Sequence, residues 1–295
     1  MTSLFVPVND TDTLHIQRLF TNPEGPVVFL VHGSVENGRI FYSQSGKGWG
    51  PWLASKGYDV YAIDLRGRGK SVPPVQRGSD YGNPEAILED IPAALAEIRS
   101  IRGADVPMHW GAHSWGGVLL QGYLARFPDS NVLSVMCFGT VRTKKVRNVK
   151  RFLNINLGYF GLGALLTGLY GYLPAKRFGF GSDNEPSTLY RQTKAWMLAE
   201  RWTSPRDGYD YDQRMTECSF PPTLYLAGGA DEYLAHVSDI RRHVEPLLDG
   251  QTEMWVLSQK AGNHHDYGHN DMLTHKDAPL DHFPKMLDWM KRWES

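Results

Sequence analysis

The sequence predicts an α/β protein with a mostly parallel central sheet, helices on both faces of that sheet and an inserted helical cap. Three observations support this fold class. Short apolar runs alternate with amphipathic stretches in the first half of the chain. The first of these runs are unbroken, as in strands that are buried on both faces. A long interval in the middle of the chain then interrupts the alternation.

Five segments have the composition of strands. Residues 27–31 (VVFLV) and 58–63 (YDVYAI) are β-favouring runs, and residues 106–110, 132–138 and 223–227 are the other three. Because helical stretches separate the early strands, right-handed crossovers would join them into a parallel sheet.

Amphipathic helices are predicted around these strands. The clearest begins near Asn83, a candidate cap, has Pro84 in its first turn and ends before Gly103. Its apolar stripe is Ile87, Ile91, Leu95 and Ile98. A second stripe at Leu119, Leu120, Tyr123, Leu124 and Phe127 ends at Pro128, and a final helix has the stripe Phe283, Met286, Leu287 and Met290.

Composition excludes several classes of protein. The chain has 295 residues, 41% of them hydrophobic, which is enough for a core and excludes disorder. Its 31 Lys and Arg balance 32 Asp and Glu, so a dedicated nucleic-acid binder is not expected. Cys137 and Cys218 cannot form a disulfide framework, and no secretory signal is recognisable. We therefore expect a cytoplasmic protein.

Residues 142–218 lack convincing strands and are predicted to form the helical cap, inserted into a core of residues 1–141 and 219–295. The cap begins with six cations in ten residues: Arg142, Lys144, Lys145, Arg147, Lys150 and Arg151. A charge-free run, residues 152–175, follows, long enough to span a bilayer but rich in glycine. A single span would also put the regions of Ser114 and Asp231 on opposite sides of a membrane.

Ser114 is the candidate nucleophile. It lies at a predicted strand-to-helix junction in the sequence GAHSWGG. A serine on so tight a turn needs small neighbours, which Ala112 and Gly116 supply, although Ala112 stands where the G-x-S-x-G pattern has glycine. Without further context, a serine that only caps the helix remains an equal alternative.

Two other motifs follow predicted strands: His32-Gly33-Ser34 and the sequence DLRGRGKS, residues 64–71. Together with the Ser114 motif, their order resembles the serine hydrolases of the α/β-hydrolase superfamily, of the capped, esterase- or acid-lipase-like kind. The resemblance covers nearly the whole chain, with the cap where that family inserts its lids. It implies that the backbone N–H groups of Ser34 and Trp115 form the oxyanion hole, and that His32 and Asp64 anchor loops.

In this superfamily the catalytic residues run in the order serine, acid, histidine. The acid should follow the strand at residues 223–227. Asp231 is therefore the family-like choice, and Glu232 is the alternative.

The histidine is chosen from His264, His265 and His269. His269 is preferred because GHNDML, residues 268–273, is similar to the string around the catalytic histidine of acid-lipase-like members. His265 is the main alternative, and His113 beside the nucleophile is expected to pack. So many imidazoles and carboxylates also suggest a metal site, but no further ligand set is apparent and the chemistry of the fold needs no metal or cofactor.

The resulting hypothesis is a Ser114–His269–Asp231 hydrolase that cleaves carboxylic esters with an apolar acyl or alcohol portion through an acyl-enzyme. Trp115 is the best candidate to line the acyl pocket. Thioester hydrolysis or acyl transfer on the same triad is the alternative, followed by a non-catalytic ligand-binding protein. Residues 152–175 are expected to be a pocket wall. A sharper hypothesis makes the cap an interfacial lid that interacts weakly with anionic lipid surfaces.

Overall fold

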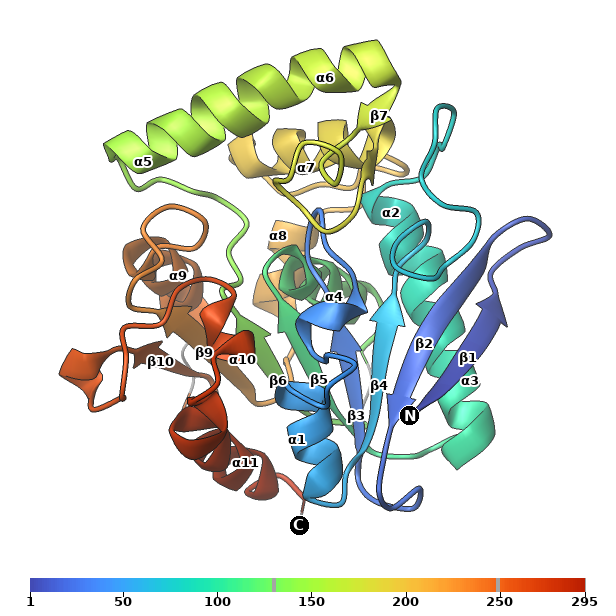
Figure 1. Ribbon diagram of the computed structural model, residues 1–295, viewed down its shortest axis with the longest axis vertical. Helices are drawn as coiled ribbons and strands as arrows, with labels where there is room; N and C mark the ends of the chain where they lie inside the picture. Colours follow the sequence, from blue (N-terminus) through green and yellow to red (C-terminus); the bar gives the residue numbers. More distant parts are fainter. Residues whose placement is uncertain (129–130, 248–249, 295) are drawn as a thin grey trace.

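The computed structural model describes residues 1–128, 131–247 and 250–294. Its centre is an eight-stranded sheet in the order β1-β2-β4-β3-β5-β6-β9-β10. The strands from β4 to β10 are parallel, and only β1 and β2 add antiparallel pairings at one edge. The predicted fold class is confirmed (Figure 1). The strands are β1 (Thr2–Pro7), β2 (Thr13–Leu19), β3 (Val27–Val31), β4 (Asp59–Asp64), β5 (Met108–His113), β6 (Val132–Phe138), β9 (Thr223–Gly228) and β10 (Glu253–Leu257).

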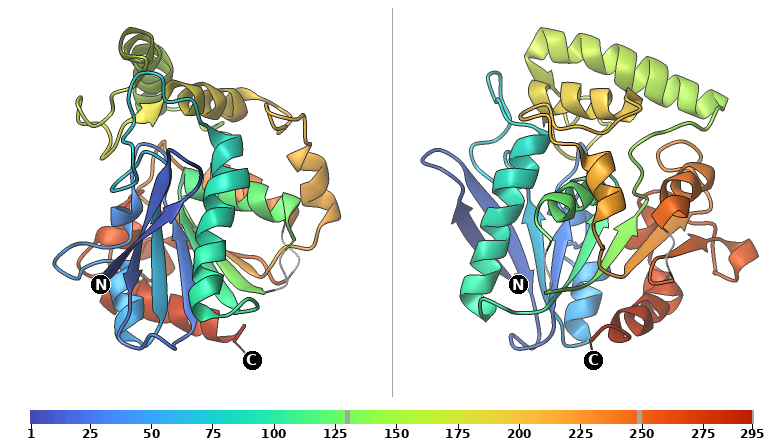
Figure 2. Two further views of the ribbon diagram at one scale, coloured as in Figure 1. Left: turned by 90° about the vertical axis from the view of Figure 1, so that its right-hand side faces the viewer. Right: turned by 180° about the vertical axis from the view of Figure 1, so that it is seen from behind.

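Helices cover both faces of the sheet. Helices α1 (Trp49–Ser55) and α11 (His282–Lys291) pack their apolar side chains into one cluster, and α3 (Ile91–Arg102), α4 (Trp115–Arg126) and α9 (Val237–Val244) pack into a second cluster on the opposite face. Figure 1 shows the first pair in front of the sheet, and the view from behind in Figure 2 shows α3 and α4 on the other side. Shorter elements are α2 (Asn83–Glu85), η2 (Ala86–Asp90), α8 (Tyr211–Glu217) and α10 (Asp271–Thr274).

Several boundaries differ from those predicted. Strand β5 begins two residues later than expected and continues to His113, because Pro107 lacks the N–H that a central strand must donate. The hairpin β1–β2 and strand β10 were not predicted at all. Gly82, not Asn83, caps the helix after β4, and the Asn83 side chain instead accepts a hydrogen bond from Nε1 of Trp115 at 2.9 Å.

The segment predicted to form the cap, residues 142–218 and called the cap below, leaves the sheet after β6 and returns to it at β9. Its first helix runs unbroken from Val149 to Tyr170 through α5 (Val149–Arg151), η3 (Phe152–Leu162) and α6 (Gly163–Tyr170). Helix α7 (Ser187–Leu198) lies beneath it (Figure 1). The expectation of a cap without strands is wrong in one detail, because β7 (Tyr172–Leu173) and β8 (Glu185–Pro186) form a short antiparallel ribbon.

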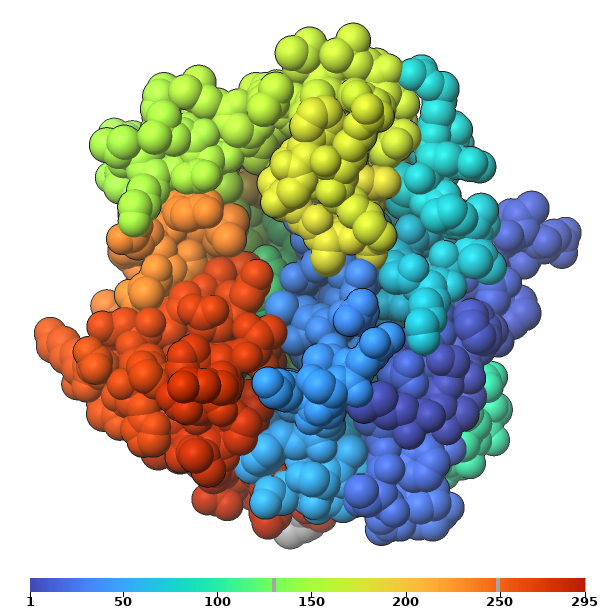
Figure 3. All heavy atoms as spheres, viewed as in Figure 1, coloured from blue at the N-terminus to red at the C-terminus, as the bar shows by residue number. Residues whose placement is uncertain are grey.

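The long cap helix is long and apolar enough to cross a membrane, and only 22% of its most apolar stretch is buried. However, β6 and β9, which flank the cap in sequence, pair directly with each other, Val135 opposite Thr223. A helix whose two flanks return to one sheet cannot have crossed a bilayer. It lies across the top of the molecule instead (Figure 3), over the carboxyl ends of the strands (Figure 1).

Candidate active site

Ser114 occupies a strained turn between β5 and α4, with φ 52° and ψ −120°. Its N–H donates to the Phe138 carbonyl at 2.7 Å. A Cβ on Gly33 would lie 2.8 Å from Cβ of Ser114, and one on Gly116 would lie 2.4 Å from the Val31 carbonyl oxygen, so the turn admits no larger residue at either position. The Ser114 side chain makes no capping hydrogen bond to α4, which removes the main reason for reading it as an ordinary helix cap.

Asp231 and His269 form a hydrogen-bonded pair. Asp231 lies in the turn after β9 and His269 in the loop before α10, and Nδ1 of His269 is 2.6 Å from Oδ2 of Asp231. Asp231 also accepts from the N–H groups of Leu234 and Ala235 at 2.9 Å. These bonds fix the carboxylate in one orientation, so that it holds the imidazole by one nitrogen and leaves the other available.

Burial and neighbouring charge set the protonation of this pair. Burial opposes the ionised form of Asp231. The hydrogen bond and charge of His269, the bond from the Ala235 N–H and the charge of Lys144 together outweigh burial and lower the pKa of Asp231 to about 2. Burial lowers the pKa of His269 below its usual 6.5, and the bond to Asp231 restores only part of that shift. Near pH 7 the pair is therefore an ionised carboxylate and a mostly neutral imidazole, which is the state a general base requires.

Gly139, in the turn after β6, connects Ser114 to this pair. It has φ 59°, and a Cβ added to it would lie 2.8 Å from Cε1 of His269. Its neighbours on both sides bind Ser114, because the Phe138 carbonyl accepts from the Ser114 N–H and Oγ1 of Thr140 donates to the Ser114 carbonyl at 3.1 Å. Ser114 and His269 therefore border the same three-residue turn.

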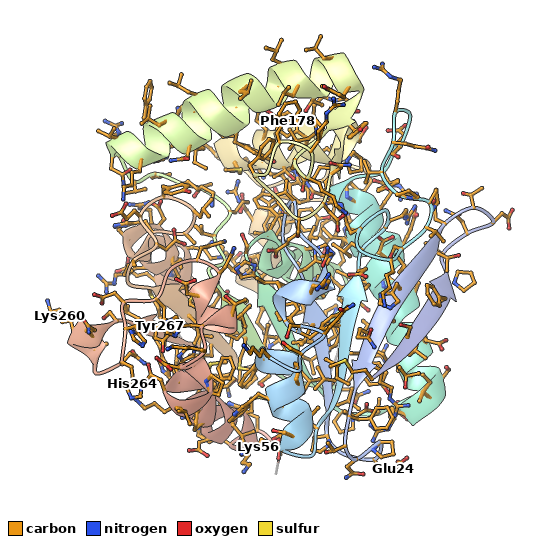
Figure 4. The ribbon with its side chains drawn as sticks, in the orientation of Figure 1. Glu24, Lys56, Phe178, Lys260, His264 and Tyr267 are labelled. Carbon is orange, nitrogen blue, oxygen red and sulfur yellow. The ribbon has the colours of Figure 1, made fainter. Side chains whose placement is uncertain are left out.

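The alternative residues lie elsewhere. Glu232 is exposed and pairs with Lys150. His265 bonds Asp277 at 2.7 Å with both side chains partly exposed. His264 lies at the outer edge of the molecule, whereas the nearby Tyr267 points inward (Figure 4).

A buried ion pair, His113 with Glu36, supports the site from behind. Nδ1 of His113 is 2.7 Å from Oε1 of Glu36, and Nε2 donates to the His269 carbonyl at 3.2 Å. Burial opposes the charge on each partner, yet their attraction prevails, raising the pKa of His113 and lowering that of Glu36. Glu36 also accepts from the N–H of Gly33. Glu36 and His113 together therefore join the loop after β3 to the His269 loop, a role that the sequence did not reveal.

The loop after β3 carries Ser34, a predicted oxyanion residue, and the cap holds this loop in place. Val35 has φ 52°, which is strained for a β-branched residue. Its N–H donates to Oε1 of Glu185 at 2.9 Å, and its carbonyl accepts from the Asp183 N–H at 3.1 Å. The Asp183 carboxylate also accepts from Nδ2 of Asn37 at 2.6 Å. Asp183 and Glu185 are thus structural parts of the site that sequence reasoning missed.

Trp115, the other predicted oxyanion residue, opens α4, so its backbone N–H belongs to the first helical turn, where donors have no partner within the helix. His32 and Asp64 both join loops, as the resemblance implied. Nε2 of His32 accepts from the Leu65 N–H at 3.0 Å, and Asp64 accepts from the Gly38 N–H at 2.8 Å.

A small hollow, partly open to solvent, adjoins Ser34 and Trp115. Apolar side chains on its walls include Leu65, Ala86, Trp115, Leu119 and Leu189. From the cap it is lined by Glu185 and Leu189, and by no residue of the segment 152–175. That segment was expected to be the pocket wall, but α7 lies between it and the core (Figure 1).

The cationic stretch at the start of the cap divides into two groups. Arg142 is buried and donates to the carbonyls of Trp196 and Ala199 at 2.8 and 2.9 Å. Lys144 donates to the Leu234 carbonyl, and burial lowers its pKa to about 8 beside the Asp231–His269 pair. Of the six cations, Lys145, Arg147 and Lys150 are exposed.

Comparisons with known proteins agree with this architecture. The family model for the α/β-hydrolase fold matches residues 26–168. Similar solved structures include an esterase (EaEST) from Exiguobacterium antarcticum, 16% identical with a TM-score of 0.64, where 98% of this chain covers 100% of that one. The chain has the α/β-hydrolase fold.

Two further similar structures of the α/β-hydrolase fold are the esterase RhEst1 from Rhodococcus sp. ECU1013 and the thioesterase domain from the curacin biosynthetic pathway. The first is 19% identical with a TM-score of 0.61, and the match covers 99% of this chain and 100% of that one. The second is 18% identical with a TM-score of 0.57, covering 97% and 99%. A search of curated proteins by sequence gives no match.

This α/β-hydrolase chain also contains one group of side chains, among the residues described, that could hold a metal ion. His265, His275 and Asp277 place their ligand atoms within 4.8 Å of one another. The group shares no residue with the Ser114 site, and the hydrogen bond between His265 and Asp277 accounts for its closest contact.

Proposed function

We propose that the protein is a serine hydrolase that cleaves carboxylic esters, with Ser114 as nucleophile, His269 as general base and Asp231 as the group that orients His269. In this mechanism His269 takes the Ser114 proton as the oxygen attacks the ester carbonyl. The protonated imidazole then gives that proton to the leaving alcohol, and a water molecule activated by His269 releases the acid from the acyl-enzyme. The backbone N–H groups of Ser34 and Trp115 stabilise the oxyanion.

The observation that carries this proposal is the 2.6 Å hydrogen bond between Asp231 and His269. His269 borders Gly139, whose two neighbours in the chain bind the strained Ser114. A helix-capping serine needs no strain and no neighbouring histidine. The lowered pKa of His269 supports its role as a base, because an imidazole must be neutral to accept a proton.

Ser114→Ala tests the proposal. Ester turnover should fall by several orders of magnitude, on the order of the 10⁶ seen when a triad serine is removed. The matched control is Ser55→Ala, on the opposite end of the core, whose hydroxyl donates only to the Trp52 carbonyl. Full activity of Ser114→Ala would reject the mechanism, and inactivity of wild type towards every ester would reject the function.

Thioester hydrolysis or acyl transfer would use the same residues. The likeness in fold to a thioesterase domain favours this alternative over a non-catalytic role. A panel of esters and thioesters of graded acyl length, with and without added alcohol or thiol acceptors, distinguishes the three reactions by product analysis. A non-catalytic binding protein would turn over none of them and would not be labelled by a serine-reactive phosphonate.

We further propose that the outer face of the long cap helix binds an anionic lipid surface. Six apolar side chains on the helix, Phe152, Leu153, Leu157, Leu162, Leu165 and Leu169, are between 52% and 63% exposed. The exposed Lys145, Arg147 and Lys150 lie at its N-terminal end. A helix with this distribution lies in the interface, with its apolar side chains among the lipids.

Sedimentation with lipid vesicles tests whether the outer face of the long cap helix binds lipid. The protein should sediment with vesicles containing phosphatidylserine. Only three cations are exposed, and Lys150 is already paired with Glu232, so charge contributes little, at about 1 kcal/mol per free cation. High salt should therefore weaken binding without abolishing it. Leu165→Ser with Leu169→Ser should reduce binding while hydrolysis of dissolved esters is retained. No binding at low salt, or self-association through this face seen by light scattering without vesicle binding, would reject the lipid surface.

A further inference from the structure

The hollow beside the oxyanion loop contains an arginine that the proposed chemistry does not use. Arg68 follows β4 and is 2% exposed. Its Nη2 donates to Oε1 of Glu185 at 3.3 Å, a long contact for an ion pair. Among the described residues, none accepts a hydrogen bond from its Nε or Nη1. Both nitrogens are buried, and an arginine donor buried without an acceptor is costly.

Neighbouring carboxylates do not supply that acceptor, and their hydrogen bonds go to other donors. Glu185 accepts from the Val35 N–H at 2.9 Å and from the Tyr159 hydroxyl at 3.5 Å. Asp90, on the same hollow, accepts from Nε and Nη2 of Arg66 at 2.9 and 2.6 Å. Arg66 is therefore satisfied within the protein, whereas Arg68 is not.

A second polar atom in the hollow has the same property. Oγ of Ser34 is buried and has no hydrogen-bond partner among the described residues. Ser34 and Arg68 both line the hollow, and so does Trp115. The apolar walls next to these groups, Leu119 and Leu189, suit methylene groups. A group that entered beside the reacting carbonyl would thus meet apolar walls and two kinds of unused hydrogen-bonding atoms.

We propose that Arg68, with Ser34, binds a second oxygen acceptor on the substrate, a carboxylate or a carbonyl, carried on the acyl or the alcohol portion of the ester. Arginine has only donors, so the group it recognises must be an acceptor. The preferred substrates are then half esters of dicarboxylic acids, or esters with a second carbonyl, rather than simple alkyl esters. This inference rests on the proposed ester hydrolysis and specifies its substrate class.

The test compares matched substrates. One set consists of 4-nitrophenyl half esters of succinic, glutaric and adipic acids, their terminal amides and the alkyl esters of equal chain length. A second set carries the same three end groups on the alcohol portion of an acetate ester. In one of the two sets, the carboxylate or the amide should exceed the alkyl ester in kcat/KM by about 10- to 100-fold, chiefly through KM.

Variants attribute the preference to the arginine. Arg68→Met should remove most of it. Because Glu185 would then lack its cationic neighbour, Arg68→Met combined with Glu185→Gln is made as well, and phosphonate labelling of Ser114 checks that both variants fold. Lys70→Met, an equal loss of charge at an exposed position of the same loop, should keep the preference.

The outcomes separate the two proposals. Equal or better hydrolysis of the alkyl esters in both sets, or a preference that survives in both Arg68 variants, overturns the acceptor site and leaves ester hydrolysis intact. If water alone satisfies Arg68, the alkyl esters will be the equals of the others. Failure of wild type to hydrolyse any member of either set rejects the proposed function instead.

Discussion

An ordinary surface helix buries apolar side chains and exposes polar ones, whereas the cap buries carboxylates on its inner face and exposes apolar side chains on its outer face. The inner face presents buried carboxylates, Asp183 and Glu185, to the loop after β3. The outer face presents leucines that are more than half exposed, among them Leu165 and Leu169. Charge buried against the site and apolar surface left in solvent are both unfavourable, unless each has a partner.

The difference indicates two separate roles for one insertion. The inner carboxylates replace backbone hydrogen bonds that the strained loop at Val35 cannot make for itself, so the cap completes the proposed oxyanion site rather than only covering it. The outer leucines contact nothing in that site. Changes on the inner face should therefore alter the chemistry, and changes on the outer face should alter only where the protein acts.

Glu185→Ala, on the inner face, should have the largest effect on the proposed chemistry. Without the Glu185 carboxylate, the Val35 N–H loses its acceptor and the Ser34 N–H moves, and a misplaced oxyanion donor costs about 10²–10³ in kcat. Glu185→Gln keeps an acceptor oxygen and should lose far less. Leu165→Ser, the outer-face control, should keep wild-type turnover of dissolved esters, and equal losses in Glu185→Ala and Leu165→Ser would contradict the division of roles.

Asp183→Ala should have a smaller effect, about 10-fold in kcat/KM, because its carboxylate holds the loop through Asn37 and Gly69 rather than at Val35 itself. Asp183→Asn, which retains an acceptor, serves as the control. Steady-state kinetics on one dissolved ester suffices. A loss as great as that of Glu185→Ala would mean that the whole inner face, and not the Val35 contact, positions the oxyanion loop.

The smallest expected effect is a shift in the pH dependence of kcat/KM when Lys144, near the start of the cap, is replaced. kcat/KM should rise with pH as His269 loses its proton and level off above a pKa that lies below 6.5. The positive charge of Lys144 helps to lower that pKa. In Lys144→Met the imidazolium is less disfavoured, so the rise should move to higher pH. Arg147→Met is the matched control, and an unmoved or acid-shifted profile in Lys144→Met would contradict the assignment.

Sequence alone predicted what periodicity and local motifs encode. The strands β3 and β6 occur at the predicted residues, and the stripe Ile87, Ile91, Leu95 and Ile98 is buried as a helix of that period requires. Ser114 could be placed because a strand–serine–helix turn needs small neighbours within a few residues.

Contacts between distant segments could not be predicted in this way. Glu36, Asp183 and Glu185 act through partners as far as 150 residues away in sequence, and no local pattern marks them. The two histidine–aspartate pairs illustrate the same limit, because His265–Asp277 and His269–Asp231 have nearly equal lengths, 2.7 and 2.6 Å. Burial distinguishes them, and burial is a property of the fold.

The rate of phosphonate labelling at Ser114 tests the central claim most directly, because it requires the nucleophile and its base but no particular substrate. We expect wild type and His265→Ala to be labelled at Ser114 at similar rates, His269→Ala to be labelled several orders of magnitude more slowly, and Ser114→Ala not at all. Peptide mapping of the adduct identifies the residue. A phosphonate adduct on another residue, or rapid labelling of Ser114 in His269→Ala, would contradict the Ser114–His269–Asp231 mechanism.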